Sequence, residues 1–96
     1  MYVVSLTYVK PIEEIDPLLP AHIEWLEEHY GAGRFLASGR KVPRTGGVIL
    51  AAKMARQELD AILAADPFHQ NGVAQYDVTE VEISKAADHL QGLVGA

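Results

Sequence analysis

The sequence contains no cysteine. This absence excludes disulfide bonds, thiol nucleophiles, and zinc or iron–sulfur sites with cysteine ligands. There is also no apolar run near the roughly 20 residues that span a bilayer, and the first segment, MYVVSLTYVK, is too short and too alternating for a signal peptide. We therefore expect a soluble, cytoplasmic protein that has no membrane partner.

Basic residues are few: 8 Lys and Arg against 13 Asp and Glu give a net charge of −5. No basic stripe follows any expected element, so nucleic acid is not an expected partner and a small molecule is favoured. The hydrophobic fraction of 49% is that of a folded protein. We expect one domain over residues 1–96. A chain of this length buries only about 60 to 65% of its unfolded surface, which makes self-association plausible.

The spacing of apolar residues predicts six main elements in the order β, α, β, β, α, β. The strands are expected over residues 2–9, 34–39, 46–54 and 73–84, with a hairpin joining the middle two and a bulge near Thr79-Glu80. The first helix begins with Asp16 as N-cap, or one turn later at Pro20, and ends at Gly31 or Gly33. The second covers residues 55–66, and Ser84 is expected to cap a short tail helix.

Each main helix has a predicted buried stripe. The stripes are Leu19, Ile23, Leu26 and Tyr30 in the first helix, and Ala55, Leu59, Ile62 and Leu63 in the second. His22 lies on or beside the first stripe. Trp25 is expected to pack in the core, His29 to be structural or exposed, and His89 in the tail likewise.

The order of elements predicts an α+β, ferredoxin-like fold: a four-stranded antiparallel sheet with two helices on one face. The other face is also partly apolar, since Val3 and Val9 lie opposite Leu6 in the first strand. A solvated face is expected to be polar. We therefore expect a homodimer that packs through the open sheet face.

This topology brings distant residues to one edge of the sheet. The start of the first helix, the end of the second helix, the end of the first strand and the hairpin loop meet there. They carry His22, Asp66, Tyr8 and the segment 39–45, respectively. Asp66 is unusual because an anion at a helix C-terminus is unfavourable. A broken local rule of this kind indicates a candidate functional site.

Four motifs in order resemble the YciI-like (YCII-related) family of the dimeric α+β barrel superfamily. They are PAHIEWL (20–26), LASG (36–39), GGVILA (46–51) and AADPF (64–68), the last followed by Gly72. The resemblance implies an active-site pair that falls on His22 and Asp66. One departure is Arg40, since family members usually have Ser-Gly-Pro where this chain has Ser38-Gly39-Arg40. Most members have no assigned reaction, and one type of relative is a dehydrochlorinase in chloroaromatic breakdown.

A histidine beside an aspartate forms a general acid–base pair. We expect His22 and Asp66 to be catalytic in an elimination, isomerisation or dehydrochlorination of a small anionic or aromatic metabolite. Residues at the same edge are expected to bind the substrate, namely Tyr8, Ser38, Gly39, Arg40 and Arg44. Arginine side chains suit a carboxylate or phenolate, although a merely solvated basic loop is an alternative.

Other functions remain open. The same dimeric barrel architecture also serves as a ligand-sensing domain, and fold does not determine function. A non-catalytic ligand-binding or regulatory module is therefore an alternative. A monooxygenase has no supporting motif. We expect no cofactor and no metal, although His22, Asp66 and His69 form an alternative metal-ligand set.

Overall fold

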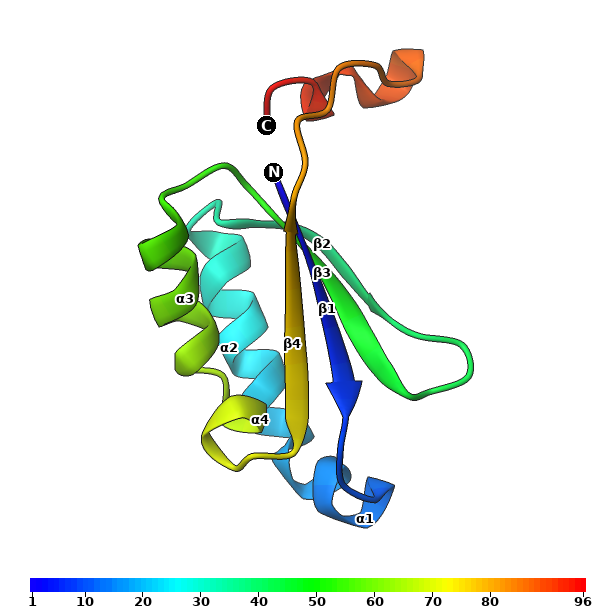
Figure 1. The fold of residues 1–96 in the computed structure, drawn as a ribbon, viewed down its shortest axis with the longest axis vertical. Helices are drawn as coiled ribbons and strands as arrows, with labels where there is room; N and C mark the ends of the chain where they lie inside the picture. The colour runs from blue at the N-terminus through cyan, green and yellow to red at the C-terminus, as the bar shows by residue number, and fades with distance from the viewer.

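The chain folds into one antiparallel sheet with its longer helices on one face (Figure 1). The computed structural model describes all residues from Met1 to Ala96. The elements are β1 (Tyr2–Tyr8), α1 (Ile12–Ile15), the 3-10 turn η1 (Asp16–Leu18), α2 (Leu19–Gly31), β2 (Phe35–Arg40), β3 (Gly46–Ala51), α3 (Arg56–Ala64), α4 (Pro67–Gln70), β4 (Ala74–Glu80) and the 3-10 segment η2 (Asp88–Leu93). No helix is long and apolar enough to cross a membrane.

The four strands lie in the order β2-β3-β1-β4, and every neighbouring pair is antiparallel. Both α2 and α3 lie on the same face of this sheet (Figure 1). The ferredoxin-like arrangement predicted from the sequence is therefore confirmed, as is the β2–β3 hairpin.

The pairing of β1 with β4 is continuous from Tyr8↔Ala74 to Tyr2↔Glu80. The predicted bulge near Thr79-Glu80 is therefore wrong. No bulge is needed because Val81 lies beyond the strand, where its N–H donates to the carbonyl of Met1 at 2.8 Å. The irregularity in the sheet lies instead in β2, between Phe35 and Ala37.

Helix α2 begins at Leu19, with Pro20 in its first turn, which is the later of the two predicted starts. Proline is suited to that position because the first N–H groups of a helix have no partner within the helix. Asp16 does not cap the helix. Its carboxylate instead accepts a hydrogen bond from Arg44 at 2.8 Å.

The buried face of α2 differs from the predicted stripe. Its buried residues are His22, Trp25 and His29, whereas Ile23 is 46% exposed. Leu19, Leu26 and Tyr30 are half-buried at the margin of the core. The predicted stripe was chosen from apolar residues alone, so it left out the two buried histidines. Each of the three inward residues has at least one internal hydrogen-bond partner, as when Trp25 Nε1–H donates to the carbonyl of Ile62 at 3.0 Å.

His29 is a buried residue of the α2 C-terminus rather than an exposed one. Arg34 donates to its Nδ1 at 3.2 Å. Arginine can only donate, so the ring proton of neutral His29 lies on Nε2. The nearest carboxylate to Nε2 is Glu28, at 3.5 Å. Burial lowers the pKa of His29, which favours this neutral form.

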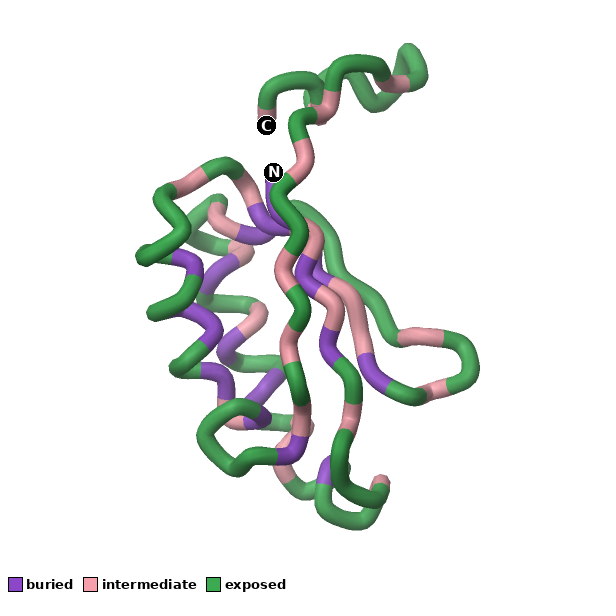
Figure 2. The backbone as a smooth tube through the Cα atoms, viewed as in Figure 1, coloured by how far each residue is buried: buried purple, intermediate pink, exposed green.

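The core lies between the sheet and α2 and α3 (Figure 2). Its central members come from strands β1, β2 and β3 and from helices α1, α2, α3 and α4: Val4, Leu6, Ile15, Trp25, Phe35, Ile49, Leu59, Ile62, Leu63 and Phe68. The inward positions predicted for α3 are confirmed except Ala55, which is exposed because it precedes the helix as its N-cap. Ala87, not Ser84, begins the tail segment η2, so the predicted cap is wrong.

Candidate functional site

Asp66 lies between two helices and begins the second of them. Helix α3 ends at Ala64, and Asp66 has extended φ and ψ angles of −62° and 127° as the N-cap of α4. Its Oδ1 accepts the N–H of Phe68 at 3.0 Å. Pro67 follows at the first helical position, where its missing N–H costs nothing. The view of Asp66 as an ill-placed anion at a helix C-terminus is therefore wrong, since it is a favourable cap of the next helix.

His22 and Asp66 are joined by a short hydrogen bond. The distance from His22 Nδ1 to Asp66 Oδ1 is 2.8 Å, and the aspartate is fully buried. Because Oδ1 also accepts from the Phe68 backbone, it acts as an acceptor, and Nδ1 of His22 carries the proton that is donated. The other nitrogen, Nε2, is left with its lone pair. We call His22 and Asp66 the dyad.

Phe68 fixes the plane of the His22 ring. The two rings stack with centroids 4.0 Å apart and planes only 7° from parallel. Phe68 itself is held in the core by an edge contact with Tyr8, with centroids 5.9 Å apart. The same residue therefore supplies a backbone donor to Asp66 and a packing surface to His22.

Tyr76 is a third member of this cluster and was not a predicted site residue. Its hydroxyl donates to Oδ2 of Asp66 at 2.5 Å. Burial raises the pKa of Tyr76, and the hydrogen bond and charge of Asp66 raise it further. Tyr76 lies on the same face of β4 as Val78, and both pack against the core. The alternation of residues along a strand does not show which residue the Tyr76 hydroxyl contacts.

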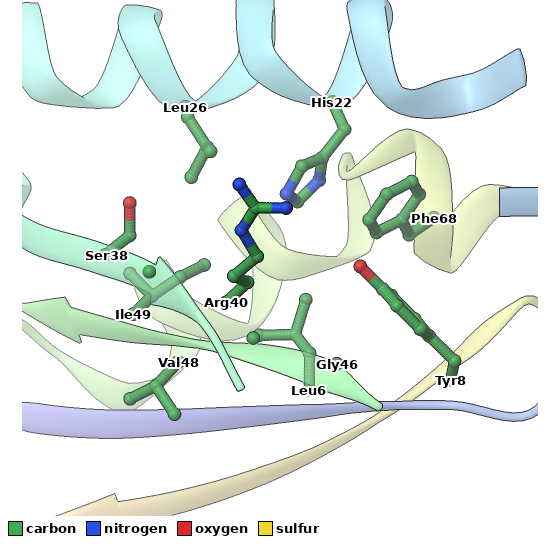
Figure 3. Close-up of a pocket in the computed structure, with 12 residues that line it drawn as sticks. Leu6, Tyr8, His22, Leu26, Ser38, Arg40, Gly46, Val48, Ile49 and Phe68 are labelled. Atoms are coloured by element: carbon green, nitrogen blue, oxygen red, sulfur yellow. The ribbon is translucent and has the colours of Figure 1, made fainter. Parts of the chain in front are cut away.

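A cavity of about 220 Å³ opens beside the dyad (Figure 3). Tyr8, His22, Ser38, Gly39 and Arg40 all line it, as the sequence predicted for this edge. Sequence reasoning missed its other walls, which are mostly apolar or glycine: Leu6, Leu26, Gly46, Gly47, Val48, Ile49 and Phe68. Asp66 is not in the wall because it lies behind His22.

Two arginines that were predicted together have different positions. Arg40 extends into the cavity from β2 (Figure 3), and no ion pair joins it to a protein carboxylate. Arg44 is not in the cavity wall. It is bound to Asp16 at 2.8 Å and lies 6.0 Å from the centre of the Tyr8 ring. Arg40 is thus the cation of the cavity, and no Asp or Glu lines it.

The alternative metal-ligand set is not assembled. His69 is exposed, and its ring lies 5.5 Å from that of Tyr76. No group of three or more His, Cys, Asp or Glu side chains has a geometry that could hold a metal ion.

Comparisons with known proteins agree with this fold. No curated protein sequence matches the chain. Among solved structures, the chain is similar to 5-chloro-2-hydroxyhydroquinone dehydrochlorinase from Burkholderia phenoliruptrix, determined in complex with 2,5-dihydroxybenzoquinone. The sequences are 17% identical, the TM-score is 0.72, and the match covers 93% of this chain and 98% of that one. A family model for the YCII-related domain matches residues 1–82. The chain therefore belongs to the YCII-related family.

Proposed function

We propose that this protein is a small-molecule enzyme in which His22 and Asp66 are the general acid–base pair. The observation that carries the proposal is the bond from His22 Nδ1 to the buried Asp66, which leaves Nε2 free on a residue that lines the cavity. A base must present its lone pair to the substrate, and a buried carboxylate behind the ring stabilises the imidazolium that forms.

The proposed chemistry is a proton transfer followed by elimination or isomerisation. Nε2 of His22 takes a proton from a carbon or hydroxyl of the substrate, and the electron pair left behind forms a new double bond. In an elimination that pair expels a leaving anion, such as chloride. In an isomerisation the imidazolium returns the proton to a different atom, and nothing is lost.

The lining of the cavity favours a single-ring molecule that carries a negative charge. Apolar side chains and glycines form most of the walls, Arg40 provides an unpaired cation, and there is no competing carboxylate. An arginine binds a carboxylate or phenolate through two parallel hydrogen bonds. Tyr8, Ser38 and Gly39 complete the proposed binding site, whereas Arg44, bound to Asp16, supports Tyr8 from outside the wall.

The test is a turnover screen with wild-type protein and His22→Gln. The compounds are chlorinated and hydroxylated hydroquinones, 2,5-dihydroxybenzoquinone and single-ring carboxylates, followed by absorbance and halide release. For any compound that turns over, kcat/KM is expected to fall about 10²- to 10⁴-fold in His22→Gln, the usual contribution of a general base.

The matched control is His89→Gln, which changes an exposed histidine in the tail and is expected to leave turnover unchanged. Equal turnover by His22→Gln and wild type would contradict the proposal. Binding without turnover that survives in His22→Gln would favour the ligand-binding module instead.

We also propose that a second copy of the chain covers the open sheet face. The helices cover one face only, and the centre of the other carries Val3 and Leu50, both half-buried. These residues are neighbours in the β1–β3 register, where Val3 pairs with Leu50. Such an apolar sheet face is stabilised by packing against an identical one.

Sedimentation is expected to give twice the chain mass of 10.5 kDa. Leu50→Lys is expected to weaken the dimer at least about tenfold, since a lysine in the interface loses solvation without gaining a partner. Ile23→Lys is the control, because Ile23 is an exposed apolar residue of α2. A monomeric wild type would refute the dimer.

A further inference from the structure

The two carboxylate oxygens of Asp66 accept different numbers of hydrogen bonds. Oδ1 accepts from both His22 Nδ1 and the Phe68 N–H. Oδ2 has one protein partner, the hydroxyl of Tyr76 at 2.5 Å. Asp66 has no exposed surface, and a buried carboxylate oxygen without a donor is costly. The stabilisation of negative charge on Oδ2 therefore depends on the hydrogen bond from Tyr76.

We infer that Tyr76 is a positioning residue that keeps His22 in its singly protonated form, with Nε2 free to act as a base. The inference rests on the proposed function, since it takes His22 as that base. A strong donor on Oδ2 draws the carboxylate charge away from Oδ1, so Asp66 attracts a second proton onto the His22 ring less strongly. Tyr76 thus acts on His22 through Asp66.

The surroundings keep Tyr76 in the role of donor. Its position on β4 is fixed by pairing with Leu6 of β1, and its raised pKa means that the phenol retains its proton. The remaining titratable or charged groups near the dyad are Arg40 and Tyr8 in the cavity wall and His69 beside Tyr76. None of these three forms a hydrogen bond with Asp66, so none can replace the Tyr76 hydroxyl.

The test is nitrogen-15 NMR of the His22 ring at pH 7 in the full chain and in Tyr76→Phe. Wild type is expected to show a neutral ring with its proton on Nδ1. In Tyr76→Phe the ratio of doubly to singly protonated rings is expected to rise about tenfold or more, which is the effect of losing one hydrogen bond to a charged group.

Tyr2→Phe is the matched control. It removes a buried hydroxyl that donates to the carbonyl of Met54 at 2.9 Å, at the opposite end of β1 from Tyr8. Its His22 spectrum is expected to equal that of wild type. An unchanged His22 spectrum in folded Tyr76→Phe would overturn the inference.

A second measurement needs only wild-type protein and holds even where Tyr76→Phe does not fold. The hydroxyl proton of Tyr76, shared with a buried carboxylate, is expected to give a downfield resonance that exchanges slowly with water. Its absence at low temperature would also overturn the inference. Neither measurement depends on turnover, so turnover that is indifferent to His22→Gln would refute the proposed function alone.

Discussion

Gly46→Ala is expected to lose about 4 kcal/mol or more of folding stability, at the upper end of single-substitution effects. A Cβ at residue 46 would overlap the backbone carbonyl of Leu6, with the carbonyl carbon only 2.8 Å away. Leu6 belongs to β1 and Gly46 to β3, and these two strands are paired, with Gly46 opposite Thr7. Neither side of the contact can rotate away as a flexible side chain would, so the two strands must separate.

Gly39→Ala is the control for this prediction. Gly39 also lines the cavity, but a Cβ there meets nothing within 4 Å. Its effect is expected to lie within about 0.5 kcal/mol, as for an ordinary surface change. Urea unfolding followed by circular dichroism measures both variants. Similar stabilities of Gly46→Ala and Gly39→Ala would show that the strands can separate at little cost.

Asp66→Asn is expected to abolish most of any turnover while the fold is retained. The amide oxygen can still cap α4 and accept from His22, and the amide nitrogen can donate to the Tyr76 oxygen. The negative charge, however, is gone, and with it the stabilisation of the imidazolium. We expect kcat/KM to fall about 10²- to 10⁴-fold.

Asp66→Ala separates the chemical role of this residue from its structural one. It removes the cap and one partner of a buried pair, for which a loss of about 3 to 5 kcal/mol is typical. Asp66→Asn should unfold at a clearly higher urea concentration than Asp66→Ala. Asp77→Asn, which changes an exposed carboxylate on β4, is the control for charge alone. Full turnover in Asp66→Asn would mean that Asp66 only holds the two helices together.

The sequence was sufficient for the topology and for the edge where the site forms. The order of the elements and the direction of each were enough to bring His22, Asp66 and Tyr8 together. Connection order determines which ends of a sheet coincide, and it does not depend on side-chain detail. Both glycines that close the predicted hairpin, Gly39 and Gly46, are also in the cavity wall.

Contacts made by single side chains could not be predicted from the sequence. Arg40 and Arg44 are the same residue type in the same region of the chain, and only the fold shows that Asp16 is close enough to bind Arg44. The partner of Tyr76 likewise depends on how α4 packs against β4. The sequence placed Asp66 at the end of a helix rather than at the start of one. The reason is that α4, with four residues, is too short to produce a periodic pattern.

One carboxylate oxygen, Oδ1 of Asp66, both starts α4 and orients His22. Local unwinding at residue 67 and release of the imidazole are therefore a single event rather than two. The amide proton of Phe68 is shielded only while that oxygen is in place. Its rate of exchange with deuterium would thus report, without any substrate, how often the protein loses a competent site.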